Sequence, residues 1–252
     1  MSRFELIAFD ADDTLWENER FYLAAQDRFR SMLIEYHAPD WIDDRLYEAE
    51  VRNLPHFGYG IKAFALSMIE TAIELTEGRI SSDDILTIIA TAKEMLAFDI
   101  ELLDHAAQTV ELMSKTYSLM VITKGDLLDQ EKKIARSGLA SFFRHVAVLS
   151  DKKPADYAAL FDRHEISPER VLMVGNSLRS DILPVLEIGG SAVYVPHEFT
   201  WSHESAERPP ADRHGFYQLT NIGELPGLIQ ILEREWNNGI TGKGGADQRS
   251  PG

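Results

Sequence analysis

FELIAFDADDTL, residues 4–15, indicates the fold class, because an apolar run ends there in two aspartates, Asp10 and Asp12. A buried parallel strand reads as an apolar run of this kind, and open α/β sheets carry their chemistry beyond the carboxyl ends of their strands. Residues two apart in an extended chain point the same way, so both carboxylates face that crevice. The stretch predicts a nucleophile and an acid/base at a strand end, with a cation between the like charges.

The composition is that of a globular protein. With 252 residues and 44% hydrophobic content, the chain can bury the core of one large domain or of two smaller ones. A formal charge of −16 disfavours nucleic-acid and anionic-membrane partners and leaves a small phosphorylated substrate open. There are no cysteines, which excludes disulfides and thiolate metal sites. No apolar run approaches the roughly 18 residues of a membrane span or resembles a signal peptide, so we expect a cytoplasmic location.

The residues after Leu15 have helical periodicity without an obvious strand. Three apolar helix faces begin near Phe21, Ile61 and Ile85, and they must hide against each other. The segment 16–100 is therefore predicted to be an inserted helical bundle, with a turn at 53–60 between two of its helices. The sequence does not define the oligomeric state.

From about residue 101 onward, predicted strands and helices alternate as in βα units. We expect strands at 117–123, 145–149, 170–174 and 191–195 and a last helix at 222–236. The fold class is thus α/β, with a doubly wound, mostly parallel, Rossmann-like sheet. Its core comprises residues 1–15 and 101–236, and the helical domain residues 16–100. Residues 237–252 are Gly-rich and polar, and we expect them to be disordered.

Polar side chains follow three of the further strands of this predicted sheet. Thr123 and Lys124 end the first of these strands, Lys152 and Lys153 follow the next, and Asn176 and Asp181 follow the third. A hydroxyl, a cation and carboxylates are thereby expected to converge at one edge of the sheet.

These residues resemble the four motifs of the haloacid dehalogenase-like superfamily, in the expected order over most of the chain. DADDTL at 10–15 is similar to the first motif, Asp-x-Asp-Gly-Thr-Leu, and Thr123 to the second. Lys153, directly before Pro154, is similar to the third, and is favoured over Lys152 for that reason. Gly175-Asn176-(four residues)-Asp181 resembles the fourth. The helical insertion resembles the type C1 cap of subfamily I, and the pattern that of its phosphatase branch.

The resemblance implies a Mg²⁺-dependent phosphate-monoester hydrolase that acts on a small phosphorylated metabolite. Asp10 would form an aspartyl-phosphate, and Asp12 would serve as acid and base. Two further sets of residues are implied: Thr123, Lys124 and Lys153 would bind the phosphate, and Asp10, Asp12, Asn176 and Asp181 would hold Mg²⁺.

Three residues depart from the family pattern. Asn176 replaces a usual Asp and removes one negative charge from the metal site, Asp13 stands where Gly is usual, and Lys124 replaces a common Asn. Two other functions stay open. One is a metal-free haloacid dehalogenase, which has no need of Asp12. The other is a catalytically weak protein that binds a phosphorylated ligand or a partner, as Asn176 indicates.

Two further clusters have alternative interpretations. His56, Phe57 and Tyr59, in the predicted turn, either contact substrate or pack as an ordinary turn. His197, His203 and Glu204 lack the His-Glu-x-x-His spacing of a zinc helix, so we expect a loop packed by Trp201 near the mouth of the site.

Overall fold

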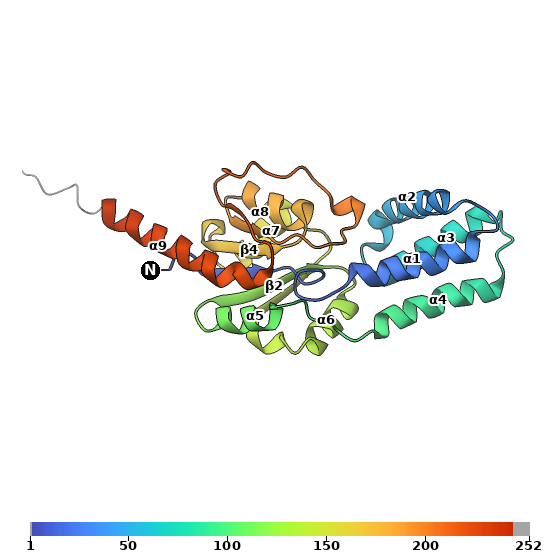
Figure 1. Cartoon of the computed structure of the whole chain (residues 1–252), viewed down its shortest axis with the longest axis horizontal. Helices are drawn as coiled ribbons and strands as arrows, with labels where there is room; N and C mark the ends of the chain where they lie inside the picture. Colours follow the sequence, from blue (N-terminus) through green and yellow to red (C-terminus); the bar gives the residue numbers. More distant parts are fainter. Residues whose placement is uncertain (1, 244–252) are drawn as a thin grey trace, which may run out of the picture.

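The structure, a computed structural model, describes residues 2–243, and its centre is a parallel sheet of six strands (Figure 1). The strand order is β3-β2-β1-β4-β5-β6, and every neighbouring pair is parallel. The strands are β1 (Leu6–Phe9), β2 (Ser118–Lys124), β3 (His145–Leu149), β4 (Val171–Gly175), β5 (Ser191–Tyr194) and β6 (Phe216–Gln218). The predicted fold class is confirmed, and β1 lies in the middle of the sheet.

Helices cover both faces of the sheet. On one face lie α5 (Ala106–Ser114), α6 (Leu127–Arg136) and α9 (Leu225–Lys243), packed on alternate strand residues such as Ile7 and Phe9. On the other face lie α7 (Pro154–Arg163) and α8 (Leu183–Glu187), packed on Leu6 and Ala8. Because both faces of β1 are buried, its sequence is a continuous apolar run. A π-helical turn at Leu178–Ile182 precedes α8, and short 3₁₀ turns lie at Ala140–Phe142, Pro168–Arg170, Ser202–Glu204 and Ile222–Glu224.

Four helices form a separate layer at one end of the molecule (Figure 1). They are α1 (Glu19–Leu33), α2 (Pro39–Phe57), α3 (Ile61–Leu75) and α4 (Ser82–Ala97), and they bury their own cluster around Phe29, Leu46 and Met68. The sequence indicated three helix faces and a turn at 53–60, which is wrong in part. Helix α2 runs through Asn53, whose buried amide donates to Ser67 Oγ at 3.1 Å, so the turn begins only at Gly58.

The predicted end of the chain also needs correction. Helix α9 continues to Lys243, so residues 237–243 are helical where disorder was expected, and residues 244–252 lie outside the described part. The division into a core and a cap domain stays a prediction. Among residues 2–243, no helix has the length and apolar character needed to cross a bilayer.

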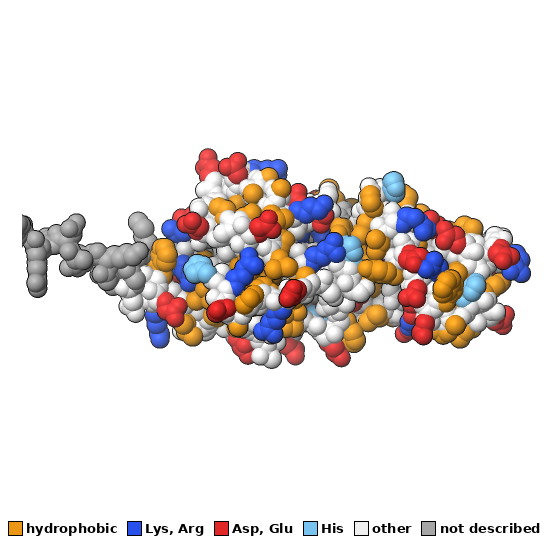
Figure 2. Space-filling model, turned by 90° about the horizontal axis from the view of Figure 1, so that it is seen from above, with side chains coloured by type: hydrophobic (Ala, Val, Ile, Leu, Met, Phe, Trp, Pro, Cys, Tyr) orange, Lys and Arg blue, Asp and Glu red, His pale blue; other side chains and the backbone are white. Residues whose placement is uncertain are grey.

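Hydrophobic side chains gather at the junction between the helical layer and the sheet layers, as Figure 2 shows from above. The aromatic contacts across this junction come from the segment after β5: Trp201 packs edge-on against Tyr47 of α2 and against Tyr59. These contacts hold that segment against the helical layer, over the carboxyl ends of the strands.

Candidate active site

Asp10 follows β1 directly and lies at the carboxyl edge of the sheet. Its amide donates to Val174 O at 2.9 Å, which extends the ladder between β1 and β4 by one bond, and the residue is only 6% exposed. Thr14 Oγ1, on the turn that follows, lies 3.0 Å from Asp10 Oδ2 and 3.3 Å from Asn176 Oδ1. The turn therefore brings oxygen atoms from two strand ends together.

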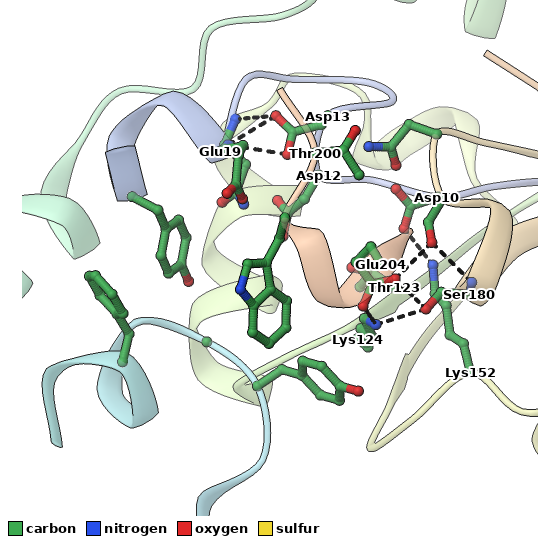
Figure 3. Close-up of a pocket in the computed structure, with 18 of the residues that line it drawn as sticks. Asp10, Asp12, Asp13, Glu19, Thr123, Lys124, Lys152, Ser180, Thr200 and Glu204 are labelled. Atoms are coloured by element: carbon green, nitrogen blue, oxygen red, sulfur yellow. Dashed lines mark hydrogen bonds and ion pairs between the residues drawn. The ribbon is translucent and has the colours of Figure 1, made fainter. Parts of the chain in front are cut away.

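Lys152 supplies the cation of this cluster. Its buried ammonium donates to Asp10 Oδ1 (Figure 3). It also donates to Asp181 Oδ1, at 2.8 Å. Lys153 points away: its side chain is 71% exposed and pairs with Asp151. The prediction of Lys153 in the site is thus wrong, and Lys152 occupies that place. Neighbouring residues of an extended segment point in opposite directions, so only one of the two lysines can enter the site.

Gly175 makes room for the second carboxylate. A Cβ at this position would lie 2.3 Å from Asp181 Oδ2, closer than any real contact allows. Asp181 is 1% exposed, and its Oδ2 accepts from the Ser177 amide at 2.9 Å, which ties it to the turn after β4. The Gly at the end of β4 thus permits Asp181 to lie beside Lys152.

The acids of this cluster have too little positive charge around them. Burial, followed by the charge of Asp181, raises the pKa of Asp10 to about 7 even though Lys152 lowers it. The two carboxylates in turn hold the pKa of Lys152 well above its usual range, against the effect of burial. Carboxylate and amide oxygens from Asp10, Asn176 and Asp181 are the donors that Mg²⁺ prefers, and a divalent cation would relieve the excess negative charge. The residues present therefore fit such an ion.

Three donors fix the Asp12 carboxylate. Trp16 Nε1 donates to Asp12 Oδ1 at 2.7 Å, Gln130 Nε2 donates to Oδ2 at 2.8 Å, and Lys133 Nζ lies 3.1 and 3.3 Å from the two oxygens. Burial lowers the pKa of Lys133, but the charges of Asp12 and Asp129 outweigh it and raise the pKa above its usual value. Asp12 thus faces α6, in the same cavity as Asp10.

Thr123 and Lys124, at the end of β2, have different surroundings. Thr123 Oγ1 is buried and accepts from Gln130 Nε2 at 2.9 Å, so its own O–H is left to donate. Lys124 Nζ donates to Ser180 Oγ at 2.8 Å and to Glu204 Oε1 at 2.5 Å. Glu204 has a pKa lowered to about 2, because Lys124 and two serine hydroxyls outweigh the effect of burial. Both residues line the cavity, but Lys124 is already paired.

The cavity holds about 160 Å³ between the carboxyl ends of the strands and the helical layer. Tyr59 and the glycines on either side of it line this cavity. His56 and Phe57 do not, because both lie exposed in the last turn of α2. Of the three tentative substrate contacts, the structure brings only Tyr59 to the site.

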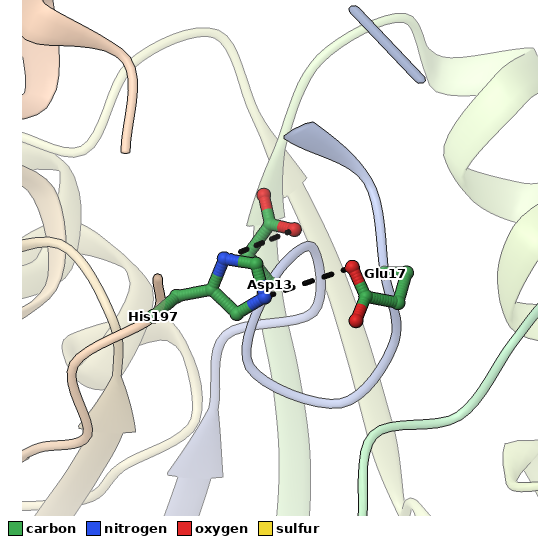
Figure 4. A group of neighbouring side chains, drawn as sticks. All are labelled: Asp13, Glu17 and His197. Carbon is green, nitrogen blue, oxygen red and sulfur yellow. Dashed lines mark ion pairs between the residues drawn. The ribbon is translucent and has the colours of Figure 1, made fainter. Parts of the chain in front are cut away.

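Asp13 differs from Asp10 and Asp12 in that its carboxylate contacts backbone amides. It adopts the left-handed φ of 60° that a Gly would accept freely, and its carboxylate accepts from the Asn18 and Glu19 amides at 2.8–3.1 Å. It thus caps the first turn of α1. The His197 ring lies beside this carboxylate (Figure 4). Its Nδ1 is 3.8 Å from Asp13 Oδ1, and its Nε2 is 3.7 Å from Glu17 Oε2. His203 instead packs on Trp201, so His197, His203 and Glu204 do not meet in one site.

Sequence reasoning missed several residues that support the site. Gln130 and Lys133 lie three apart on α6, a spacing that places both on one helix face, and this was the available signal. Trp16 directly follows the first motif, and this position was the available signal for it. Glu204 lies in the loop that was expected near the mouth of the site, but its contact with Lys124 was not predicted.

The sequence model of the haloacid dehalogenase-like hydrolases matches residues 4–189. The chain belongs to this family. It is similar to a crystal structure of a haloacid dehalogenase-like family hydrolase from Xanthomonas campestris, with 37% identity, 94% of each chain covered and a TM-score of 0.83. A 2-haloacid dehalogenase from Pseudomonas syringae, at 22% identity and a TM-score of 0.61 over 91% of this chain and 99% of that one, shares the fold.

Two archaeal relatives carry the name glyceraldehyde 3-phosphate phosphatase. The protein from Pyrococcus furiosus is 27% identical over 93% of this chain and 95% of its own length. The protein from Methanothermobacter thermautotrophicus is 36% identical, but the match spans only 49% of this chain and 54% of that protein. The chain is therefore a hydrolase of the haloacid dehalogenase-like family, and its reaction is inferred below.

Proposed function

We propose that this hydrolase cleaves small phosphate monoesters in a Mg²⁺-dependent reaction, with Asp10 as the nucleophile. The observation that carries the proposal is the contact of the buried Asp10 carboxylate with Lys152, in a cavity that also contains Asp12. The phosphatase names of the two archaeal relatives support this choice of reaction.

Two displacements at phosphorus complete the reaction. A carboxylate oxygen of Asp10 forms a bond to phosphorus as the ester P–O bond breaks, and Asp12 gives its proton to the departing alcohol oxygen. Water then attacks phosphorus while Asp12 takes its proton, and the bond between phosphorus and Asp10 breaks. Inorganic phosphate leaves, and both carboxyl groups return to their first state.

Two donors are in place for the oxygens of the transferring phosphoryl group. The free O–H of Thr123 and the ammonium of Lys152 lie in the cavity wall beside Asp10. Fixed donors of this kind stabilise the charge of the transition state without having to reorient. We assign phosphate binding to Thr123 and to Lys152, which contacts Asp10, and not to Lys124, whose ammonium contacts Ser180 and Glu204 instead.

Asp10, Asn176 and Asp181 would hold Mg²⁺ through their side chains, together with the backbone carbonyl of Asp12. When bound, the ion neutralises the carboxylates and the phosphate. Asn176 contributes an oxygen without a charge, and the second carboxylate, Asp181, compensates for that. The metal site thereby keeps two anionic ligands.

Hydrolysis of p-nitrophenyl phosphate tests the proposal, with and without Mg²⁺, in the wild type and in Asp10→Asn. We expect phosphate release that needs Mg²⁺ and falls by at least about 10³-fold in the variant. Asp44→Asn is the matched control, because Asp44 lies exposed on α2 and the change removes the same charge. Halide release from a 2-haloacid that survives EDTA would show a dehalogenase instead, and phosphate-ester binding without turnover would show a binding protein.

A further inference from the structure

The helical layer adds two carboxylates to the cavity wall, Glu19 from the first turn of α1 and Glu50 from the middle of α2. Neither side chain makes a hydrogen bond or an ion pair with any residue in the described range 2–243. The other acids of this cavity differ in that respect, since Asp181 and Glu204 each contact a lysine. The part of the wall nearest the helical layer therefore carries two acidic side chains without a partner among residues 2–243.

No cation in the described cavity wall is free to receive a second anionic group of the substrate. Its basic residues are Lys124 and Lys152 alone, and each already contacts a carboxylate. A bisphosphate or a phosphorylated carboxylic acid would place its second charge among like charges. The wall thus disfavours anionic leaving groups.

The two carboxylates themselves lack a counter-charge. Burial raises the pKa of Glu50 to about 8, with a contribution from Glu19. Burial also raises the pKa of Glu19 to about 7, with contributions from Asp13 and other acids of the cavity. A ligand with a positive charge would favour the ionised form of both groups, whereas a neutral hydroxyl would supply no charge to offset the burial of either carboxylate.

The cavity also has the size and the aromatic surface for a small organic cation. Its volume of about 160 Å³ admits a small organic group beside the phosphate end. Tyr22 and Phe64 line the same part of the wall, with ring centroids 5.1 Å apart. Aromatic faces attract ammonium groups.

We propose, on the basis of the proposed phosphatase function, that the substrate is the phosphate ester of a small amino alcohol, and that Glu19 and Glu50 bind its ammonium group. Asp10 and Lys152 contact the phosphate end of the substrate, and the two carboxylates of the helical layer select the other end by its positive charge. The two carboxylates determine specificity and take no part in the chemical step.

A set of esters that differ in one group tests this proposal. The amino, hydroxyl and carboxylate members are 3-aminopropyl phosphate, 3-hydroxypropyl phosphate and the 3-phospho ester of 3-hydroxypropanoate. With Mg²⁺ present, we expect kcat/KM to be about tenfold higher for the amino than for the hydroxyl ester, and lowest for the carboxylate. Equal values for the amino and hydroxyl esters, or a preference for the carboxylate, would overturn the proposal.

Variants then assign the preference to the two residues. Glu50→Gln and Glu19→Gln should each reduce the ratio of kcat/KM between the amino and hydroxyl esters to near one, and Asp44→Asn should leave the ratio as it is. An unchanged ratio in both glutamine variants would refute the assignment. Calorimetric binding of the same esters to Asp10→Asn separates the two proposals, because a preference for the amino ester there supports the ammonium site even if no ester is hydrolysed.

Discussion

Replacing Glu50 by Gln should make the protein more stable at alkaline pH. Glu50 lies in the cavity wall on α2 without a partner among the described residues, and burial raises its pKa from an ordinary 4.5 to about 8. The folded protein therefore holds this proton more tightly than the unfolded chain does. Between these two pKa values the wild type loses stability as the pH rises, because the unfolded chain releases the proton first. A glutamine does not titrate and cannot contribute to that loss.

The size of the effect follows from the same pKa. One extra bound proton in the folded state changes the free energy of unfolding by about 1.4 kcal/mol per pH unit, so the contribution between pH 5 and pH 8 is at most about 4 kcal/mol. Glu50 is partly exposed to the cavity, and solvent screening reduces this figure to about 2 kcal/mol. Glu50→Gln should gain that much over the wild type across this range.

Urea denaturation in EDTA at pH 5, 6.5 and 8 measures the difference, with Asp44→Asn as the control for removal of one surface charge. The gap between Glu50→Gln and the wild type should widen with pH, while the gap for Asp44→Asn should stay nearly constant. A Glu50→Gln gap that varies by less than about 0.5 kcal/mol over this range would refute the claim that the carboxylate lacks a counter-charge.

Three further predictions concern the strand ends and α6. Lys152→Met should lower kcat/KM for p-nitrophenyl phosphate by about 10²–10³-fold, whereas Lys153→Met should change it less than about threefold. Equal losses in the two variants would contradict the assignment of the buried lysine. Gly175→Ala should displace Asp181 and so weaken Mg²⁺ binding. The Mg²⁺ concentration at half-maximal rate should rise by at least about tenfold. An unchanged value in a folded variant would argue against the metal site. Lys133→Met removes the cation beside the proposed acid/base, so the alkaline limb of the pH–rate profile should move to higher pH; a limb that stays in place would exclude this electrostatic role.

The centre of the fold could be predicted from the sequence because a strand buried on both faces has a continuous apolar sequence. Strand β1 is apolar on both faces, and Asp10 follows it, so the position of the nucleophile needs only the local pattern. Asp181 was placed by the resemblance of residues 175–181 to the fourth family motif, after an apolar strand. The space that Gly175 leaves for its carboxylate was not predicted.

Other features depend on contacts that the sequence does not encode locally. The segment at 151–153 has no apolar pattern to set which lysine points inward, and a shift of one residue reverses the direction of the side chain. Helix α2 carries a mostly polar sequence with few buried residues, so its periodicity was too weak to detect. The roles of Glu50 and Glu204 arise only when the helical layer and the segment after β5 close over the strand ends.

Trapping of a phosphorylated Asp10 during turnover distinguishes the proposed mechanism from direct attack of water on the ester. Enzyme quenched with acid while it hydrolyses p-nitrophenyl phosphate in Mg²⁺ would be treated with borohydride, which reduces an aspartyl-phosphate to homoserine, and residues 4–15 would be mapped by peptide mass spectrometry. We expect homoserine at position 10 in the turning-over enzyme and none without substrate. Phosphate release with an intact Asp10, or reduction at another carboxylate, would contradict it.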